Sequence, residues 1–182
     1  MKYCSECGSE VTSSRRPRDK GPRYVCGHCR SVFYLSPRLV VACIAAAGDR
    51  ILLCRRAVTP GYGLWSLPSG FTERDGTTAR GAVRETLEEA QAAIELDRPY
   101  ALFHIPRVNQ VQVVYLARLI DSRCKAGTES LEARLFNEAE IPWAELAFTT
   151  TRHALRQYFQ DFRSGAFGFH FADIVSFMDG TE

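Results

Sequence analysis

The 182-residue chain has no long apolar segment, little net charge and no low-complexity stretch. No apolar run approaches the ~18 residues that a membrane-spanning helix needs, so we expect no membrane partner. A formal net charge of +2 argues against a surface that coats nucleic acid, and we expect no nucleic-acid partner. A hydrophobic content of 46% is ordinary for a globular protein, and the length allows one good-sized domain with a small appendage.

The opening segment, MKYCSECGSE, has no targeting character. It lacks the apolar centre of a secretory signal and the arginine- and serine-rich composition of a transit peptide. The chain has seven cysteines, and an odd number suits a reducing compartment with metal-bound or free thiols better than a disulfide framework. We therefore expect a soluble cytoplasmic protein.

Residues 1–36 are predicted to form a separate module, a small zinc ribbon. Two C-x-x-C pairs separated by 18 residues have the spacing of such a ribbon, and they are formed by Cys4, Cys7, Cys26 and Cys29. Four thiolates complete a tetrahedral shell and leave no open position, so the predicted zinc is structural. A redox role is the alternative, but the redox motif seldom occurs twice in so short a segment. Gly8 and Gly27 are expected to supply the tight turns.

A basic run lies between the two cysteine pairs and consists of Arg15, Arg16, Arg18, Lys20 and Arg23. It could contact phosphate or RNA, or it could be a solvated loop. No aromatic residue that could stack on a base lies inside the run, which favours the solvated loop.

Residues 37–165 are predicted to form the main domain. The apolar run LVVACIAAA, from Leu39, reads as a buried strand that a turn at 48–50 joins to a hairpin partner at 51–56. Further strands are expected at 99–105, 110–119 and 131–136. A second helix, at 153–162, is expected to end at Gly165 and to bury one stripe consisting of Leu155, Tyr158, Phe159 and Phe162.

Residues 166–182 are expected to form a C-terminal tail. Phe167, Phe169 and Phe171 alternate with other residues, so an extended segment places them on one face. An added strand and docking on a partner subunit are both open, and the second alternative would make a homodimer.

A helix at 79–93, capped by Thr77 or Thr78, carries the chemistry. At 100° per residue, Glu85, Glu88 and Glu89 lie within about 100° of one another. Like charges at this spacing repel by roughly 0.2–0.5 kcal/mol per pair, so a cation is expected there, and oxygen ligands suit Mg²⁺ or Mn²⁺. The alternative is a solvated face with an ion pair between Arg84 and Glu88. The opposite stripe is expected to be buried and consists of Ala79, Val83, Leu87, Ala90 and Ile94.

The stretch from 70 to 92 resembles the Nudix box. Gly70 matches the opening glycine, and the R-E and E-E pairs at 84–85 and 88–89 have the required spacing. The resemblance implies that Glu85, Glu88 and Glu89 hold the catalytic cation and that Arg84 orients them. It also implies a further catalytic or metal-binding carboxylate later in the chain, from Glu129 or Glu132.

Three positions depart from that box. Gly76 stands where a glutamate is usual, with Asp75 beside it. Thr86 replaces an aliphatic residue, and Gln91 replaces a glycine. The expected metal ligands are all retained.

The order of ribbon, hairpin, box and later strands resembles the zinc-ribbon branch of Nudix hydrolases, which includes FAD pyrophosphatases. The motif S-Q-P-W-P-F-P of the NADH pyrophosphatases is absent. The resemblance implies an α/β fold, a Nudix-type α/β/α sandwich with a mixed sheet preceded by the small zinc ribbon. Candidate substrate contacts are Gly70, Arg107 and Gln110.

The implied function is metal-dependent hydrolysis of the diphosphate bond in a small nucleotide substrate, a nucleoside diphosphate derivative. A cation would neutralise the diphosphate and lower the pKa of a water, and a carboxylate would take its proton. FAD and ADP-ribose rank above NADH, and each would give AMP and a second monophosphate. Two alternatives remain: a nucleic-acid-binding ribbon on a weakly active Nudix scaffold, and a nucleotide-binding sensor without turnover.

Overall fold

The computed structural model describes residues 1–14, 21, 23–74 and 76–175. The chain divides into two compact units, Met1–Pro37 and Arg38–Glu182, and each is described by itself. Asp75 and four members of the basic run lie outside the described residues; those four are Arg15, Arg16, Arg18 and Lys20.

The first unit is a three-stranded antiparallel sheet in the order β1-β2-β3, made by Val11–Ser14, Arg23–Cys26 and Val32–Phe33. Its two cysteine turns have the same hydrogen bonds. The Gly8 amide donates to the Cys4 carbonyl at 2.9 Å, and the Arg30 amide donates to the Cys26 carbonyl at 3.0 Å.

Gly27 lies in the second turn, as expected, but the left-handed residue of that turn is another one. The left-handed residue of the first turn is Gly8, with φ 73°, and its counterpart in the second turn is Arg30, with φ 64°. Gly27 lies inside the turn and needs no positive φ. The second turn therefore carries a side chain where the first has none.

The second unit contains an eight-stranded mixed sheet between two helices. The main path runs β10-β5-β4-β9-β8-β11, while β6 pairs with β5 and β7 pairs with β4. The β4–β9 and β8–β11 pairs are parallel. The strands are β4 (Arg38–Ala47), β5 (Arg50–Arg56), β6 (Trp65–Ser66), β7 (Ser69–Phe71), β8 (Ile94–Ile105), β9 (Gln110–Leu119), β10 (Ser130–Phe136) and β11 (His170–Asp173).

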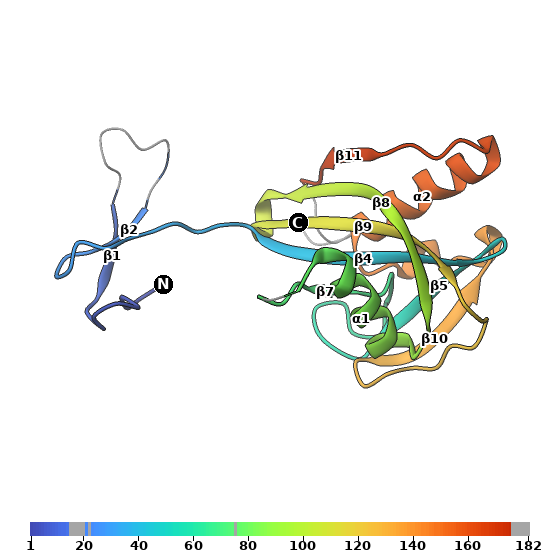
Figure 1. Ribbon diagram of the computed structural model, residues 1–182, viewed down its shortest axis with the longest axis horizontal. Helices are drawn as coiled ribbons and strands as arrows, with labels where there is room; N and C mark the ends of the chain where they lie inside the picture. Colours follow the sequence, from blue (N-terminus) through green and yellow to red (C-terminus); the bar gives the residue numbers. More distant parts are fainter. Residues whose placement is uncertain (15–20, 22, 75, 176–182) are drawn as a thin grey trace. The chain divides into compact units, whose positions relative to one another are not determined.

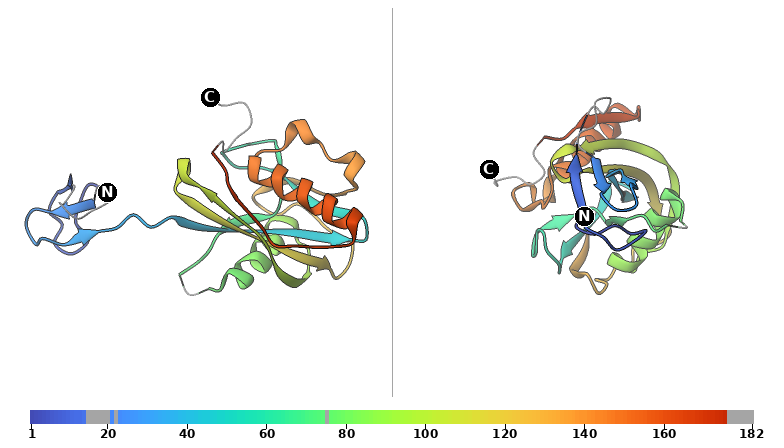
Figure 2. Two further views of the ribbon diagram at one scale, coloured as in Figure 1. Left: turned by 90° about the horizontal axis from the view of Figure 1, so that it is seen from above. Right: turned by 90° about the vertical axis from the view of Figure 1, so that its left-hand side faces the viewer.

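The helices α1 (Thr78–Ala90) and α2 (Thr149–Ser164) lie on opposite sides of this sheet (Figures 1 and 2). Short 3₁₀ turns occur at Pro106–Val108, Glu138–Glu140 and Trp143–Glu145. This architecture confirms the predicted α/β/α sandwich with a mixed sheet. Neither helix of the described chain combines the length and apolar composition that a membrane crossing requires.

The central strand β4 is buried on both faces, which explains its unbroken apolar sequence. Ala42 and Ile44 belong to the core on the α2 side, whereas Cys43 and Ala45 belong to the core on the α1 side. β4 pairs with β5 next to their turn and with β7 nearer its own start. The early part of β4 therefore has β7, and not β5, as its neighbour.

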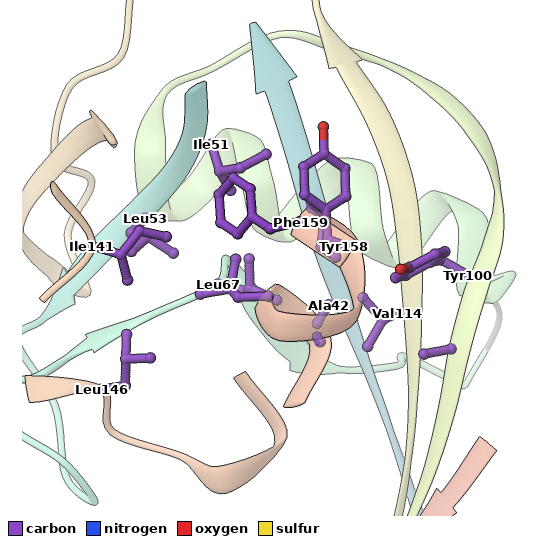
Figure 3. Packing of buried hydrophobic residues seen from close by; sticks show 14 of the residues in the cluster. Ala42, Ile51, Leu53, Leu67, Tyr100, Val114, Ile141, Leu146, Tyr158 and Phe159 are labelled. Atoms are coloured by element: carbon purple, nitrogen blue, oxygen red, sulfur yellow. The ribbon is translucent and has the colours of Figure 1, made fainter. Parts of the chain in front are cut away.

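The core under α2 is the larger one. Leu155, Tyr158 and Phe159 are buried in it, as predicted, and Figure 3 shows Tyr158 and Phe159 packed with residues of the sheet. Phe162 is exposed, contrary to the expected stripe, and stacks on Tyr158 with ring centroids 6.0 Å apart. Gly165 ends the helix with φ 71°.

The segment after α2 returns to the sheet as β11, which pairs parallel with β8. The structure thus has the added strand, one of the two alternatives for this segment. Asp161 of α2 fastens it: its Oδ2 atom accepts from His170 Nε2 at 2.8 Å, the Tyr100 hydroxyl at 2.9 Å and the Gly168 amide at 3.3 Å.

Candidate active site

The buried face of α1 differs in part from the expected one: Ala90 and Ile94 are buried as expected, but two others are not. Val83 and Leu87 of the expected stripe are 37% and 55% exposed. The buried residues are instead small or acidic: Gly81, Ala82, Glu85, Thr86, Glu89 and Ala90. Small residues let the helix backbone approach β4 and β7 closely, and a Cβ on Gly81 would already lie 3.1 Å from Val41. Two of the three glutamates therefore lie on the packed side of the helix.

Gly70 is required by the same close packing. A Cβ at this position would lie 2.2 Å from the carboxylate of Glu85, so any other residue would displace that side chain. The neighbouring Ser69 amide donates to Glu89 Oε2 at 3.3 Å. The backbone of β7 thus lies directly against the two buried carboxylates.

Both ends of α1 are fixed by the residues around them. Thr77 is the N-cap, and its hydroxyl accepts from the Arg80 amide at 3.2 Å. Gln91, where the box has a glycine, adopts the left-handed conformation with φ 48°, at a cost of about 1 kcal/mol. Its side-chain amide donates to the Ala126 carbonyl at 3.0 Å. The Gly127 amide donates to the Glu89 carbonyl at 2.9 Å, which ties the loop before β10 to the end of the helix.

The other two departures from the box are also tolerated. The hydroxyl of fully buried Thr86 donates to the Ala82 carbonyl at 2.8 Å, so no polar group is left unpaired. Gly76 has no positive φ, and a Cβ there would meet only the Glu73 carbonyl, at 3.8 Å. A glutamate would therefore fit at position 76.

Arg84 ties the acidic helix face to β7. Its guanidinium donates to Glu85 Oε1 at 2.6 Å, to Glu88 Oε2 at 2.7 Å and to the Phe71 carbonyl at 3.0 Å. These bonds fix the direction of two carboxylates.

Burial disfavours the charged form of the two enclosed carboxylates. Burial raises the pKa of Glu85, although Arg84 acts in the opposite direction. Burial also raises the pKa of Glu89 to about 8, and the nearby charges of Glu85 and Glu129 add to this rise. The Ser69 amide and Arg56 oppose the rise without reversing it. Such a site gains stability when a cation enters it.

These carboxylates line a cavity of about 640 Å³. Glu85, Glu88, Glu89 and Glu129 contribute to its wall, together with Glu73 and Arg84. Glu132 does not line it: it lies on β10 opposite Arg55 of β5. Of the two residues considered for the additional carboxylate, the structure brings only Glu129 to the box.

A second cavity of about 320 Å³ adjoins the first. Five residues line both cavities and therefore form their junction, namely Arg56, Pro60, Ser69, Gly70 and Phe71. Gln110 lies in the second cavity, as does the shared Gly70, whereas Arg107 is exposed on its 3₁₀ turn and lines neither of them.

Family models match nearly the whole chain. A zinc-ribbon model described as Nudix N-terminal matches residues 2–35, and the NUDIX domain model matches residues 36–162. The chain belongs to the Nudix hydrolase family. It is a pyrophosphohydrolase with an N-terminal Nudix zinc ribbon.

Similar proteins agree with this assignment. An ADP-ribose pyrophosphatase of Methanocaldococcus jannaschii is 30% identical over 119 residues, which cover 63% of this chain and 69% of that protein. The crystal structure of a NUDIX hydrolase from Nitrosomonas europaea is 41% identical, with a TM-score of 0.93, and the match covers 97% of this chain and 100% of that one. An ADP-ribose pyrophosphatase from Streptococcus suis is 25% identical, with a TM-score of 0.61 over 75% of this chain and 100% of that one.

The Nudix hydrolase has two groups of residues suited to metals. The cysteine sulfurs of the ribbon all lie within 4.8 Å of one another, and among the described residues they are the only group of potential ligands that converges so closely. This arrangement fits a structural zinc ion bound by Cys4, Cys7, Cys26 and Cys29. On α1 the carboxylate oxygens lie further apart, and Arg84 holds two of them. Their oxygen ligands, and the raised pKa values of Glu85 and Glu89 that a cation would lower, nevertheless fit a hard divalent cation.

Sequence reasoning missed three residues of the site. Arg56 lines both cavities, and its guanidinium lies 4.9 Å from the ring centroid of Phe148. Gln112 lies beside Gln110 in the second cavity. Arg56 could have been found as the charged end of an apolar strand facing a Pro/Gly loop. Phe148 had no such signal, because it reads as a core residue before α2.

Proposed function

We propose that this Nudix hydrolase cleaves the diphosphate of ADP-ribose, or of FAD, to give AMP and a second monophosphate. The observation that carries the proposal is the continuity of the two cavities: one lined by carboxylates, the other largely apolar. A nucleoside diphosphate derivative has the same division, with a charged diphosphate next to a flat heterocycle. The ADP-ribose pyrophosphatases among the similar proteins support ADP-ribose as the first choice.

In this proposal Glu85, Glu88 and Glu89 hold Mg²⁺ or Mn²⁺. The cation would supply charge neutralisation of the diphosphate and a lower pKa for the attacking water. Arg84 orients the ligands through its bonds to Glu85, Glu88 and the Phe71 carbonyl. Glu73 is a further acidic group on the same wall.

Arg56 is suited to bind the diphosphate at the junction of the two cavities. Its Nε donates to the Pro60 carbonyl at 2.8 Å, which fixes the guanidinium plane. Its terminal nitrogens have no hydrogen-bond partner among the residues that the structure describes, so they are available to phosphate oxygens. Glu129 faces the same cavity, and its carboxylate would accept the proton of the water as the bond to phosphorus forms.

A substrate panel tests the proposal. ADP-ribose, FAD, NADH and ATP are supplied at equal concentration with Mg²⁺ or Mn²⁺, and kcat/KM and products are determined for each. ADP-ribose or FAD is expected to lead, with AMP among the products. A clear preference for the triphosphate, with release of pyrophosphate, would overturn the proposal.

A further inference from the structure

Two glutamines at the start of β9 form a polar floor in the second cavity. Gln110 and Gln112 are separated by one residue, so they lie on the same face of the strand. On the parallel neighbour β4 they pair with Arg38 and Val40, which also line the cavity. The two amides therefore lie side by side on the sheet, next to a cationic and an apolar residue.

The two side chains are largely buried, and their amide groups are open to the cavity. Gln110 is 8% exposed and Gln112 is 7% exposed, and neither side chain has a hydrogen-bond partner in the described part of the chain. The hydroxyls of Ser66 and Ser130 also have no partner there, but they are enclosed in the packed interior, whereas Gln110 and Gln112 line a cavity. A flat ligand that fills this cavity would bury both amides, so its own polar groups must pair with them for binding to be favourable.

The walls of the cavity suit a flat ring. Phe71 lies 4.7 Å from the Arg38 guanidinium, measured to its ring centroid, and Phe148 lies 4.9 Å from that of Arg56. Val40, Ile105 and Val108 complete an apolar lining. A volume of about 320 Å³ lies at the small end of the range for ligand sites, which fits a single nucleobase better than a three-ring flavin.

We propose that Gln110 and Gln112 determine base specificity by reading the edge of the adenine ring. A glutamine amide offers one acceptor and two donors, and adenine presents its exocyclic N6 donor next to ring-nitrogen acceptors. The pairing gives both amides a partner when the ring enters the cavity, and the diphosphate then extends past Arg56 toward the carboxylates. This inference rests on the proposed function, because it assumes that the adenylate half of the substrate occupies this cavity.

The test uses Gln110→Met and Gln112→Met, which keep side-chain length and remove the hydrogen-bonding groups. Gln160→Met, at an exposed position of α2 outside both cavities, is the matched control. Calorimetry measures the binding of AMP, UMP and FMN to the zinc-loaded full chain without added Mg²⁺. The wild type is expected to bind AMP at least tenfold more tightly than UMP or FMN.

Each glutamine variant is expected to raise the Kd of AMP about tenfold and to change that of UMP little, so that base selectivity is lost. With ADP-ribose as substrate, KM should rise about tenfold while kcat stays within twofold. The control should match the wild type. A purely structural role would lower the Tm of the variants and leave the AMP-to-UMP ratio intact.

Two results would overturn the inference. One is an unchanged ratio of the AMP and UMP Kd values in both variants. The other is tighter binding of FMN than of AMP by the wild type, which would place the flavin in the second cavity. Both leave the proposed function standing if ADP-ribose or FAD is still hydrolysed. Failure of the wild type to hydrolyse either substrate would refute the proposed function, whereas glutamine-dependent AMP binding would still support the inference.

Discussion

Glu89→Gln is the most informative single change, because it removes one charge and almost no volume. Glu89 is 6% exposed and accepts a hydrogen bond from the Ser69 amide, which a glutamine carbonyl oxygen can also accept. The helix and its packing should therefore be retained. If the carboxylate holds the catalytic cation, turnover should fall about a hundredfold, which corresponds to about 2.7 kcal/mol.

The same change has a second, pH-dependent consequence. Burial raises the pKa of Glu89 from 4.5 to about 8, so between these values the folded protein binds a proton that the unfolded chain does not. The stabilisation that the folded protein gains from this protonated Glu89 is fully present below pH 4.5 and is lost as pH rises through 8. Within this window the free energy of unfolding falls by up to about 1.4 kcal/mol per pH unit. Glu89→Gln should abolish this loss.

The assay is urea unfolding at pH 6, 7 and 8 in buffer free of Mg²⁺, without a strong chelator, so that the ribbon keeps its zinc. Added Mg²⁺ should restore stability at pH 8 in the wild type and have a smaller effect in the variant. Glu145→Gln is the control, since Glu145 is exposed and lines neither cavity. Wild-type turnover in Glu89→Gln, or an unchanged pH slope, would refute the reasoning.

Three further predictions follow from the same structure. Metal analysis should find about one zinc ion per chain, lost in Cys26→Ser but kept in Cys124→Ser, with turnover retained by both; a Cys4–Cys7 disulfide in anaerobically handled protein would contradict this. Gly76→Glu should raise kcat with little change in KM, because the position has space and an ordinary φ, and a lower kcat would count against that account. Burial opposes ionisation of Asp161, but the hydrogen-bond donors of His170, Tyr100 and Gly168 outweigh burial and lower the pKa of Asp161. The stabilisation that the ionised carboxylate provides is therefore lost as pH falls through this lowered pKa. Asp161→Asn should cost about 1–3 kcal/mol near pH 7 in urea unfolding and weaken the loss of stability in acid; equal stability at pH 7 would argue that β11 is held by other contacts.

The sequence predicted the sheet well because its signals are local. The unbroken apolar run from Leu39 reflects a strand buried on both faces, and the turn at 48–50 fixes its hairpin partner. The cysteine spacing predicted the ribbon for the same reason. Both features depend on neighbours in the chain.

The buried face of α1 was predicted only in part, because large apolar residues were assumed to be the buried ones; Ala90 and Ile94 are buried as expected. Val83 and Leu87 are exposed, since the helix approaches β4 through Gly81 and Ala82, where a larger side chain would not fit. The pattern of hydrophobicity alone does not reveal the distance between the helix and the sheet. It depends on how closely β7 and β4 lie to the helix.

Residues brought together from distant segments were also beyond the sequence. The sequence offers no reason to prefer Glu129 over Glu132 as the additional carboxylate. The structure distinguishes them, because the loop that Gly127 ties to α1 brings only Glu129 to the cavity. Gln112 and Arg56 come to one site only because β9 pairs with β4 and because the end of β5 and the strand β7 line the same cavities. Such groupings are set by tertiary packing.

In the proposed function, hydrolysis of a nucleotide diphosphate depends on the α1 carboxylates. The most direct measurement follows the products of ADP-ribose with Mg²⁺ by phosphorus NMR, in the wild type and in Glu89→Gln. The wild type should yield AMP and ribose 5-phosphate in equal amounts, about a hundredfold faster than the variant. Absence of AMP with either Mg²⁺ or Mn²⁺, or equal rates in the two proteins, would contradict the account.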